Sequence, residues 1–219
     1  MRRATLDRRI FTFAADDADG PQRGTAVDST CARLQPASQK LFEAWSRLPR
    51  PEIVPTRADF DPCAIPSILP VISLIERASP DEWRVRLAGT EIERRWGREL
   101  SGLTYAEMLS SQAVEVTHCE FEAICRQPCG SWSLRHLELR SGRRLQTETL
   151  RLPLRDKRGE VSLIVSCNGE LGPELMHEPD EPREIVTVFE QRFFDIGAGI
   201  PDFTCVPAEF RRPAPQPCC

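Results

Sequence analysis

The order of secondary-structure signals through the middle of the chain is the feature that most restricts its fold. Alternating apolar and polar residues over 83–89 predict a half-buried strand, and a short turn joins it to a strand predicted over 71–77. Helical patterns follow over 90–126, and three more strands follow over 131–167. Because strands and helices fall in separate blocks, we predict an α+β domain with one antiparallel sheet.

Two of the predicted helices have an informative apolar face. Leu41, Trp45 and Leu48 recur at the spacing of one helix face, so a helix over 38–48 is expected to pack on the neighbouring core or on a second subunit. A longer helix is predicted from 112 to 126. Its expected buried face consists of Val114, Thr117, Phe121, Ile124 and Cys125.

The same patterns divide the chain into three parts. Residues 1–36 lack periodicity and are expected to form a flexible arm, 37–170 form the domain with its N-terminal helix, and 171–219 form a largely irregular extension. Within that extension, 184–197 predict a further strand or a short helix. In the last strand of the domain, the alternation points one set of residues inward: Val161, Leu163, Val165 and Cys167.

Composition argues against several classes of protein. Hydrophobic residues make up 40% and charged residues 28% of the chain, which suits a globular core. The net charge of -4 and the short basic clusters disfavour nucleic-acid binding, which depends on a basic surface. No apolar run approaches the roughly 20 residues that span a bilayer. The N-terminus lacks the apolar core of a secretory signal, so we expect a cytoplasmic protein whose nine cysteines are reduced thiols.

Three short motifs carry a resemblance to a known family. Residues 57–62 have the pattern R-x-D-F-D-P, I-P and L-P pairs follow within 65–70, and residues 86–90 are R-L-A-G-T. With FFDIGAGIP near the C-terminus, these motifs resemble a family of bacterial PAS-like proteins, over roughly residues 40–170. The resemblance implies a PAS-like five-stranded antiparallel sheet with helices packed on one face, and a sensory or regulatory role. It implies no catalytic residues.

The resemblance also places a small-molecule pocket between the inner face of the sheet and the helices. Such pockets are mostly apolar with a few polar groups. The expected lining consists of Trp83, Leu87, Trp96, Phe121, Trp132 and His136. The alternative is that the same side chains fill the core and leave no cavity.

Sequence signatures of catalysis are missing. The chain contains no G-x-S-x-G, no G-x-x-x-x-G-K-[ST] and no H-E-x-x-H. It also lacks the N-C-R-F-type string with which some PAS domains bind flavin covalently, and His118 is the one helical histidine that could hold haem. The sequence therefore does not identify a cofactor.

One group of residues on the long helix points to an alternative chemistry. His118, Glu122 and Cys125 recur at i, i+4 and i+7, and Cys129 follows at i+11. Imidazole, carboxylate and thiolate are zinc ligands, whereas the ordinary interpretation of this pattern is a half-exposed flank of the helix. His118 beside Cys119 or Cys125 could also activate a thiol.

Together these observations predict a non-catalytic PAS-like sensory or regulatory module that binds a small ligand or a protein partner in signalling. The helix over 38–48 is expected to support a homodimer. The alternative function is a thiol- or metal-dependent redox sensor or enzyme that uses His118 and Cys125. The sequence predicts no membrane association.

Overall fold

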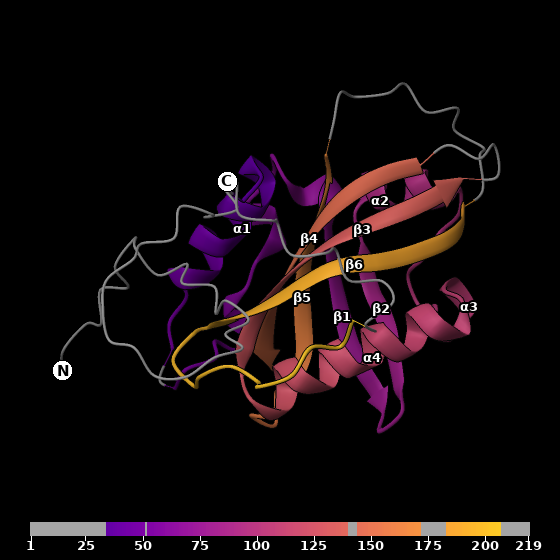
Figure 1. Ribbon diagram of the computed structural model, residues 1–219. Helices are drawn as coiled ribbons and strands as arrows, with labels where there is room; N and C mark the ends of the chain where they lie inside the picture. The colour runs from indigo at the N-terminus through magenta and orange to yellow at the C-terminus, as the bar shows by residue number, and fades with distance from the viewer. Residues whose placement is uncertain (1–33, 51, 140–143, 172–182, 207–219) are drawn as a thin grey trace, which may run out of the picture.

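Six antiparallel strands form one twisted sheet at the centre of the molecule (Figure 1). The computed structural model describes residues 34–50, 52–139, 144–171 and 183–206. Across the sheet the strands lie in the order β2-β1-β5-β4-β3-β6. Their bounds are β1 Ile72–Ser79, β2 Glu82–Ala88, β3 Cys129–Leu139, β4 Arg144–Arg155, β5 Val161–Leu171 and β6 Arg183–Asp195.

Helices cover both faces of this sheet (Figure 1). Between β2 and β3 lie α2 (Thr90–Trp96), α3 (Tyr105–Met108) and α4 (Ser111–Arg126), which cover what we call the inner face. The opposite, outer face is covered by α1 (Pro36–Ser46). Three short 3-10 turns connect α1 to β1: Arg57–Asp59, Pro62–Ala64 and Leu69–Val71. The predicted α+β PAS-like sheet is confirmed, with one strand more than expected and with α1 added on the outer face.

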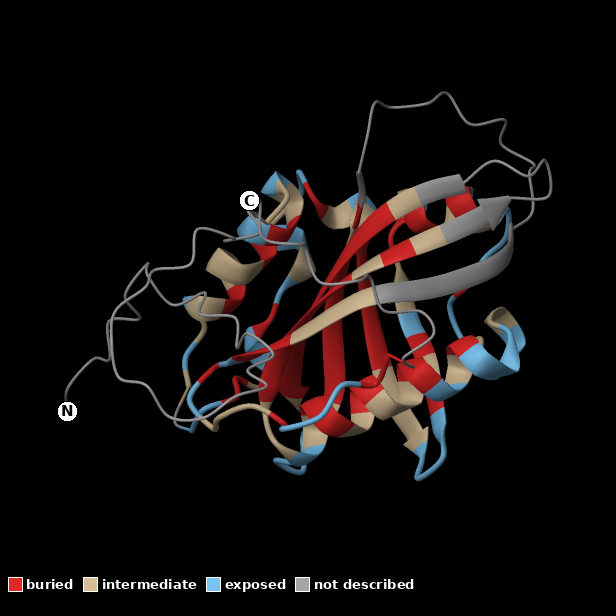
Figure 2. Ribbon diagram, viewed as in Figure 1, coloured by how far each residue is buried: buried red, intermediate tan, exposed pale blue. Residues whose placement is uncertain are grey.

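The two faces of the sheet differ in polarity. Leu150 and Leu152 of β4 point to the outer face, where they pack in the same cluster as α1. Thr149 and Arg151 of the same strand, with Asn168 of β5, point to the inner face. The alternation predicted for the last strand of the domain is present, but its apolar residues join the outer cluster. Figure 2 shows the central strands buried between the two helical layers.

A bulge in β2 changes which of its residues face the helices. Val85 pairs with Ile75, but Leu87 pairs with Leu74, so Arg86 is an extra residue in the ladder. One extra residue reverses the alternation of a strand. Val85 therefore belongs to the inner cluster, whereas Leu87 packs against the outer one.

The helix α1 is held to the outer face by two fully buried residues. Leu41 and Trp45 have no exposed surface, and Trp45 Nε1 donates a hydrogen bond to the carbonyl oxygen of Pro153 at 2.9 Å. The helix predicted over 38–48 is thus present with slightly different bounds. Leu41 and Trp45 pack on the sheet of their own chain, and Leu48 is half-buried beside the same cluster.

Two of the sequence motifs contact each other at the end of β2. Gly89 has an ordinary φ of -71° and donates its backbone N–H to the carbonyl oxygen of Ile72 at 2.8 Å. A Cβ at this position would overlap the carbonyl groups of Leu69 and Pro70. Close approach of the backbone is therefore the reason that glycine is needed here.

The chain beyond residue 170 continues the same sheet. β6 pairs with β3, with Phe193 opposite Ser131, so the strand alternative for 184–197 is the observed one. After β6, the segment that ends at Val206 packs with α4, and a disulfide joins Cys205 to Cys119. The expectation of reduced thiols is wrong for this pair, because the fold brings two cysteines 86 residues apart into contact.

Parts of the expected arm and of the expected C-terminal extension lie outside the described residues, namely 1–33, 172–182 and 207–219. Among the helices that the structure does describe, none is both long enough and apolar enough to cross a bilayer.

Candidate functional site

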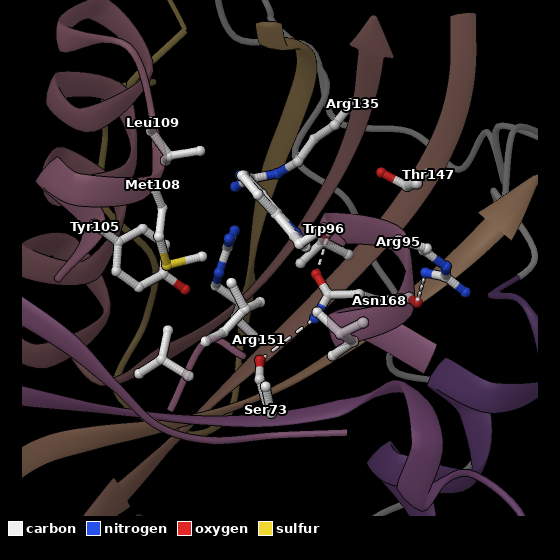
Figure 3. Close-up of a pocket in the computed structure, with 15 residues that line it drawn as sticks. Ser73, Arg95, Trp96, Tyr105, Met108, Leu109, Arg135, Thr147, Arg151 and Asn168 are labelled. Atoms are coloured by element: carbon white, nitrogen blue, oxygen red, sulfur yellow. Dashed lines mark hydrogen bonds between the residues drawn. The ribbon is translucent and has the colours of Figure 1, made fainter. Parts of the chain in front are cut away.

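A cavity of about 80 Å³ lies between the inner face of the sheet and the helices α2 and α3 (Figure 3). The strands contribute mainly polar side chains to its wall: Ser73, Arg135, Thr147, Thr149, Arg151 and Asn168. The helices and the loop between them contribute mainly apolar ones: Ile92, Trp96, Leu100, Tyr105, Met108 and Leu109. Val85, Ala88 and Arg95 complete the lining.

Asn168 organises the polar wall from β5. Its Nδ2 donates to Ser73 Oγ at 3.4 Å and to Ser166 Oγ at 3.3 Å, and its Oδ1 accepts a hydrogen bond from Thr149 Oγ1 at 3.2 Å. Arg95 Nη1 of α2 donates to the backbone carbonyl of Asn168 at 2.8 Å. These bonds fix the wall before any ligand arrives, which lowers the entropy lost on binding.

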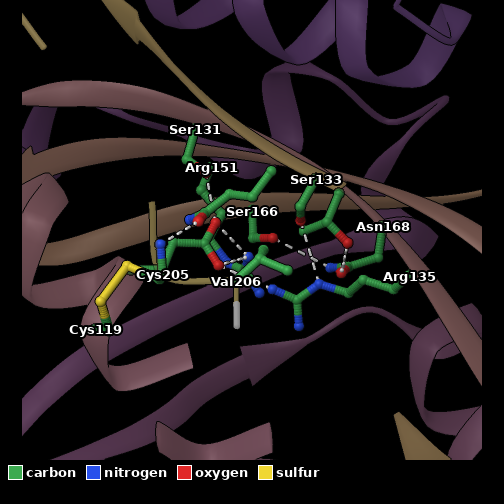
Figure 4. A network of polar contacts seen from close by, with 12 residues as sticks. Cys119, Ser131, Ser133, Arg135, Arg151, Ser166, Asn168, Cys205 and Val206 are labelled. Carbon is green, nitrogen blue, oxygen red and sulfur yellow. Dashed lines mark hydrogen bonds and ion pairs between the residues drawn. A yellow bond between two sulfur atoms is a disulfide. The ribbon is translucent and has the colours of Figure 1, made fainter. Parts of the chain in front are cut away.

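Beneath this wall lies a buried ion network of Glu120, Arg151 and Arg135. Arg151 Nη1 lies 2.7 Å from both carboxylate oxygens of Glu120, and Arg135 Nη2 lies 3.0 Å from Oε2. Ser131 Oγ donates to Oε1 at 2.5 Å, and Arg135 Nε donates to Ser133 Oγ at 3.2 Å. Figure 4 shows the two arginines and the two serines converging on the inner face.

All three charged side chains of the network are removed from water. The exposed fraction is 0% for the Glu120 side chain, 8% for Arg135 and 3% for Arg151. Arg151 also lies over the ring of Phe121, with 5.1 Å between Cζ and the ring centroid. Two guanidinium groups therefore share one carboxylate at a site that is largely shielded from water.

The pKa values of the network reflect burial and its compensation. Burial alone raises the pKa of the Glu120 carboxyl, but Arg151, Arg135 and the hydrogen bond from Ser131 outweigh burial, so that the net pKa is lowered. For Arg135, burial and then repulsion from Arg151 lower the pKa to about 10. Burial raises the pKa of Tyr105.

The structure separates the six residues expected to line a pocket. Trp96 lines the cavity. Trp83 and Phe121 pack against each other in the inner core, with ring centroids 5.0 Å apart. Leu87 is turned to the outer face by the bulge in β2.

The remaining two expected residues lie on the outer side of β3. Trp132 pairs with Leu150, whose side chain belongs to the outer cluster, while its neighbours Ser131 and Ser133 face inward. His136 shares the parity of Trp132 along the strand. Neither side chain belongs to the cavity wall.

Sequence reasoning missed the charged residues Glu120, Arg135 and Arg151. Two signals could have indicated them. Glu120 lies within the apolar face of α4, next to Phe121 and one turn before Ile124. In β4 the leucines at 150, 152 and 154 alternate with Arg151 and therefore point to the opposite face of the sheet. Arg151 is buried on the face that packs against the helices.

The candidate metal and thiol residues of α4 lie apart from the cavity. Glu122 Oε1 forms an ion pair with Arg77 Nη2 at 2.8 Å. Burial raises the pKa of the Cys125 thiol to about 12. Burial lowers the pKa of His118. Within the described part of the chain, no three His, Cys, Asp or Glu side chains are grouped as a metal site. Cys119 is bonded to Cys205 and has no free thiol.

Comparison with known families identifies the fold. A family model described as a PAS domain matches residues 33–168, which is more than half of the chain, so the chain belongs to the PAS domain family. PAS domains are typically sensory signalling modules. A comparison with curated proteins found no match.

Solved structures of light-sensing domains are among the matches. The light-state structure of the blue-light photoreceptor Aureochrome1 LOV is 14% identical, with a TM-score of 0.37, and the match covers 51% of this chain and 88% of that one. An RNA-binding Light-Oxygen-Voltage receptor is 18% identical with a TM-score of 0.36, over 56% of this chain and 37% of that one. A Light-Oxygen-Voltage domain studied with a flavin analogue is 16% identical with a TM-score of 0.33, over 51% of this chain and 84% of that one.

The cavity of this chain does not fit a flavin. Pockets that enclose ligands of that size measure about 300–1,000 Å³, and this one measures about 80 Å³. None of the described residues that line it is a cysteine, so none of them could form a covalent bond to a flavin. Three arginines occupy the wall instead.

Proposed function

We propose that this chain is a sensory PAS module that binds a small polar molecule in the cavity between its inner sheet face and α2–α3, without catalysing a reaction on it. The observation that supports this function is the polarity of the inner face. A sheet face that only packs against helices is expected to be apolar, whereas here hydroxyl, amide and guanidinium groups surround a cavity of about 80 Å³.

The contrast with the outer face strengthens the proposal. The outer face carries Leu150, Leu152 and Leu154 and packs without need of polar groups. The same strand presents Thr147, Thr149 and Arg151 to the other side, and all three are buried. Polar groups buried around a cavity provide specific contacts for a ligand at low reorganisation cost.

Native mass spectrometry of the protein, purified without denaturation from cells, tests this function. The wild type is expected to retain a small molecule that is absent from Met108→Trp, because Met108 lines the cavity and an indole there would fill it. Leu48→Trp is the matched control, since Leu48 is half-buried on the outer face and should leave the retained mass unchanged. A wild-type protein that retains nothing and whose unfolding midpoint is unmoved by a small-molecule cell extract would refute the proposal.

A homodimer and a signalling partner stay predictions. The apolar residues of α1 that suggested dimerisation are buried in their own chain, so we place any subunit contact outside them. Light scattering at micromolar concentration checks this: a mass near 24.8 kDa contradicts the dimer, and twice that mass supports it. The cytoplasmic location likewise stays a prediction.

A second candidate function, redox sensing, is favoured by one observation. The disulfide Cys119–Cys205 attaches the segment after β6 to α4, and a reducing compartment would open it. Cys125, the thiol that the sequence suggested for this role, is a weak candidate. Burial raises its pKa to about 12, so little of the reactive thiolate forms at neutral pH. Limited proteolysis before and after reduction tests the idea, with cleavage within 196–206 expected only in the reduced protein.

A further inference from the structure

The charges around the cavity do not balance. Arg135 and Arg151 together carry two positive charges, and the Glu120 carboxylate that contacts both carries one negative charge. Among the described residues that line the cavity, none carries a carboxylate. Burial of an uncompensated charge is unfavourable, and an anion that enters the site would compensate the charge.

A third arginine adds to the same field. Arg95 also lines the cavity, and its side chain is 6% exposed. Glu91, one of the groups that contact Arg95, is 28% exposed, with 3.3 Å between Arg95 Nε and Glu91 Oε1. Water screens that carboxylate more than it screens the buried guanidinium groups. Among the described side chains at the cavity, positive charges therefore outnumber negative ones.

A buried donor in the site also lacks a partner. Nε of Arg151 is buried, and within the described residues it has no hydrogen-bond acceptor. Buried polar atoms are nearly always hydrogen-bonded. Figure 3 shows the Arg135 and Arg151 side chains reaching toward each other between Tyr105 and Trp96, beside the open volume.

The rest of the wall limits the size and shape of the anion. Trp96, Met108 and Leu109 cover the cavity from the helical side, so one end of the ligand meets apolar surface. A volume of about 80 Å³ holds several water molecules, at roughly 10–15 Å³ for each. It therefore suits a molecule of a few non-hydrogen atoms with one charged end and one apolar end.

We propose that the ligand of this cavity is a small organic carboxylate, whose charged end binds Arg135 and Arg151 and whose short apolar end lies against Trp96 and Met108. Planar guanidinium groups match a carboxylate in geometry and in charge. This inference depends on the proposed ligand-binding function and specifies the chemical class of the ligand. Inorganic phosphate would satisfy the charge but not the apolar end.

The test compares matched pairs of probes by calorimetry. Acetate, propionate, butyrate and succinate are each titrated alongside the corresponding neutral amide and alongside inorganic phosphate. At least one carboxylate is expected to bind about tenfold more tightly than its amide, as expected when a charged hydrogen bond replaces a neutral one. The same carboxylate should bind more tightly than phosphate.

Two arginine variants show whether the binding uses this site. Arg135→Gln is expected to weaken carboxylate binding by about tenfold or more. Arg77→Gln is the matched control: Arg77 also pairs with a glutamate of α4 and lies over an aromatic ring, that of Trp83, but it does not line the cavity. Its dissociation constants should equal those of the wild type.

The ligand-free Arg135→Gln variant gives an independent readout. Removal of Arg135 leaves Glu120 and Arg151 as a neutral pair, so the variant should unfold at the same urea concentration as the wild type, or a higher one. An unfolding midpoint far below that of the wild type would show that Arg135 is a structural cation and would overturn the inference.

The possible failures are distinguishable. If an amide or phosphate binds as tightly as every carboxylate, the assignment of the ligand class fails while the ligand-binding function stands. If no probe binds and native mass spectrometry finds a retained neutral molecule, the ligand class is again wrong and the ligand-binding function again stands. If no probe binds and nothing is retained, both the inference and the proposed function fail.

Discussion

Glu120 is the residue on which the inner face of the sheet depends most. Its carboxylate contacts Arg151, Arg135 and Ser131, which come from three positions on two neighbouring strands. A helix residue that binds both strands fixes the position of α4 over the sheet. Loss of its charge would leave two buried guanidinium groups with no anion.

Replacement of Glu120 by Gln should lower the free energy of unfolding by about 3–5 kcal/mol, the usual cost of breaking a buried ion pair. Urea unfolding followed by circular dichroism measures it. Glu122→Gln is the control, because Glu122 lies two residues further along α4, is 25% exposed and pairs with Arg77. The loss of its charge should cost under about 1 kcal/mol. Equal effects of the two substitutions would contradict a central role for Glu120.

The same carboxylate predicts how stability varies with pH. Its pKa is lowered in the folded protein by Arg151 and Arg135 in spite of burial, so the folded state binds this proton less readily than the unfolded state. The stabilisation is therefore complete above the unfolded pKa of about 4.3 and is lost as the pH falls through the folded pKa. Urea midpoints between pH 7 and pH 3 should decrease in the wild type and decrease less in Glu120→Gln.

At the scale of elements, the contact between the end of β2 and the turn before β1 joins two motifs that are about 20 residues apart. Gly89 lies against the carbonyl groups of Leu69 and Pro70, and its own N–H binds Ile72. This contact fixes how β1, β2 and α2 meet beside the cavity.

Gly89→Ala is expected to destabilise the protein by about 1–3 kcal/mol, because the added methyl group has to displace backbone atoms. Gly169→Ala serves as the control, since a Cβ at residue 169 would meet only the Cβ of Gln35, at 4.0 Å. That substitution should be neutral or slightly stabilising. A thermal-unfolding series of both variants decides the matter, and a neutral Gly89→Ala would show that the turn can move.

Secondary structure was largely predictable because its signals are local. The alternation in β2 and β5, the helix with Leu41 and Trp45, and the capping box of α3 at Thr104 all appear within a few residues. The direction in which each strand faces was not predictable. Both faces of this sheet are buried, so alternation alone does not tell which side meets α4 and which meets α1.

The candidate site was harder to predict than the fold for a related reason. Trp83, Trp132 and Phe121 were chosen as aromatic pocket residues, but aromatic size suits a packed core as well as a pocket. The single extra residue in β2 that turns Leu87 outward has no signature in the local sequence. Arg135 and Arg151 resemble solvent-facing strand residues until the position of α4 is known.

At the scale of the whole molecule, the Cys119–Cys205 disulfide closes a loop that runs from the middle of α4 through β3, β4, β5 and β6. Reduction should lower the free energy of unfolding by about 2–4 kcal/mol, because the unfolded chain gains freedom. The expected observation is a lower urea midpoint with dithiothreitol for the wild type and no change for a Cys119→Ser, Cys205→Ser double variant. Identical midpoints for the oxidised and reduced wild type would contradict a stabilising role for the bond.

Cys119 and Glu120 are consecutive residues of α4. The Cys119 sulfur holds the segment that ends at Val206, and the Glu120 carboxylate holds the arginines of the cavity. Neither group can be displaced far without the other. Free-energy coupling between two sites is reciprocal. If a bound carboxylate changes the equilibrium constant for reduction of the disulfide by some factor, reduction of the disulfide must change the affinity for that carboxylate by the same factor.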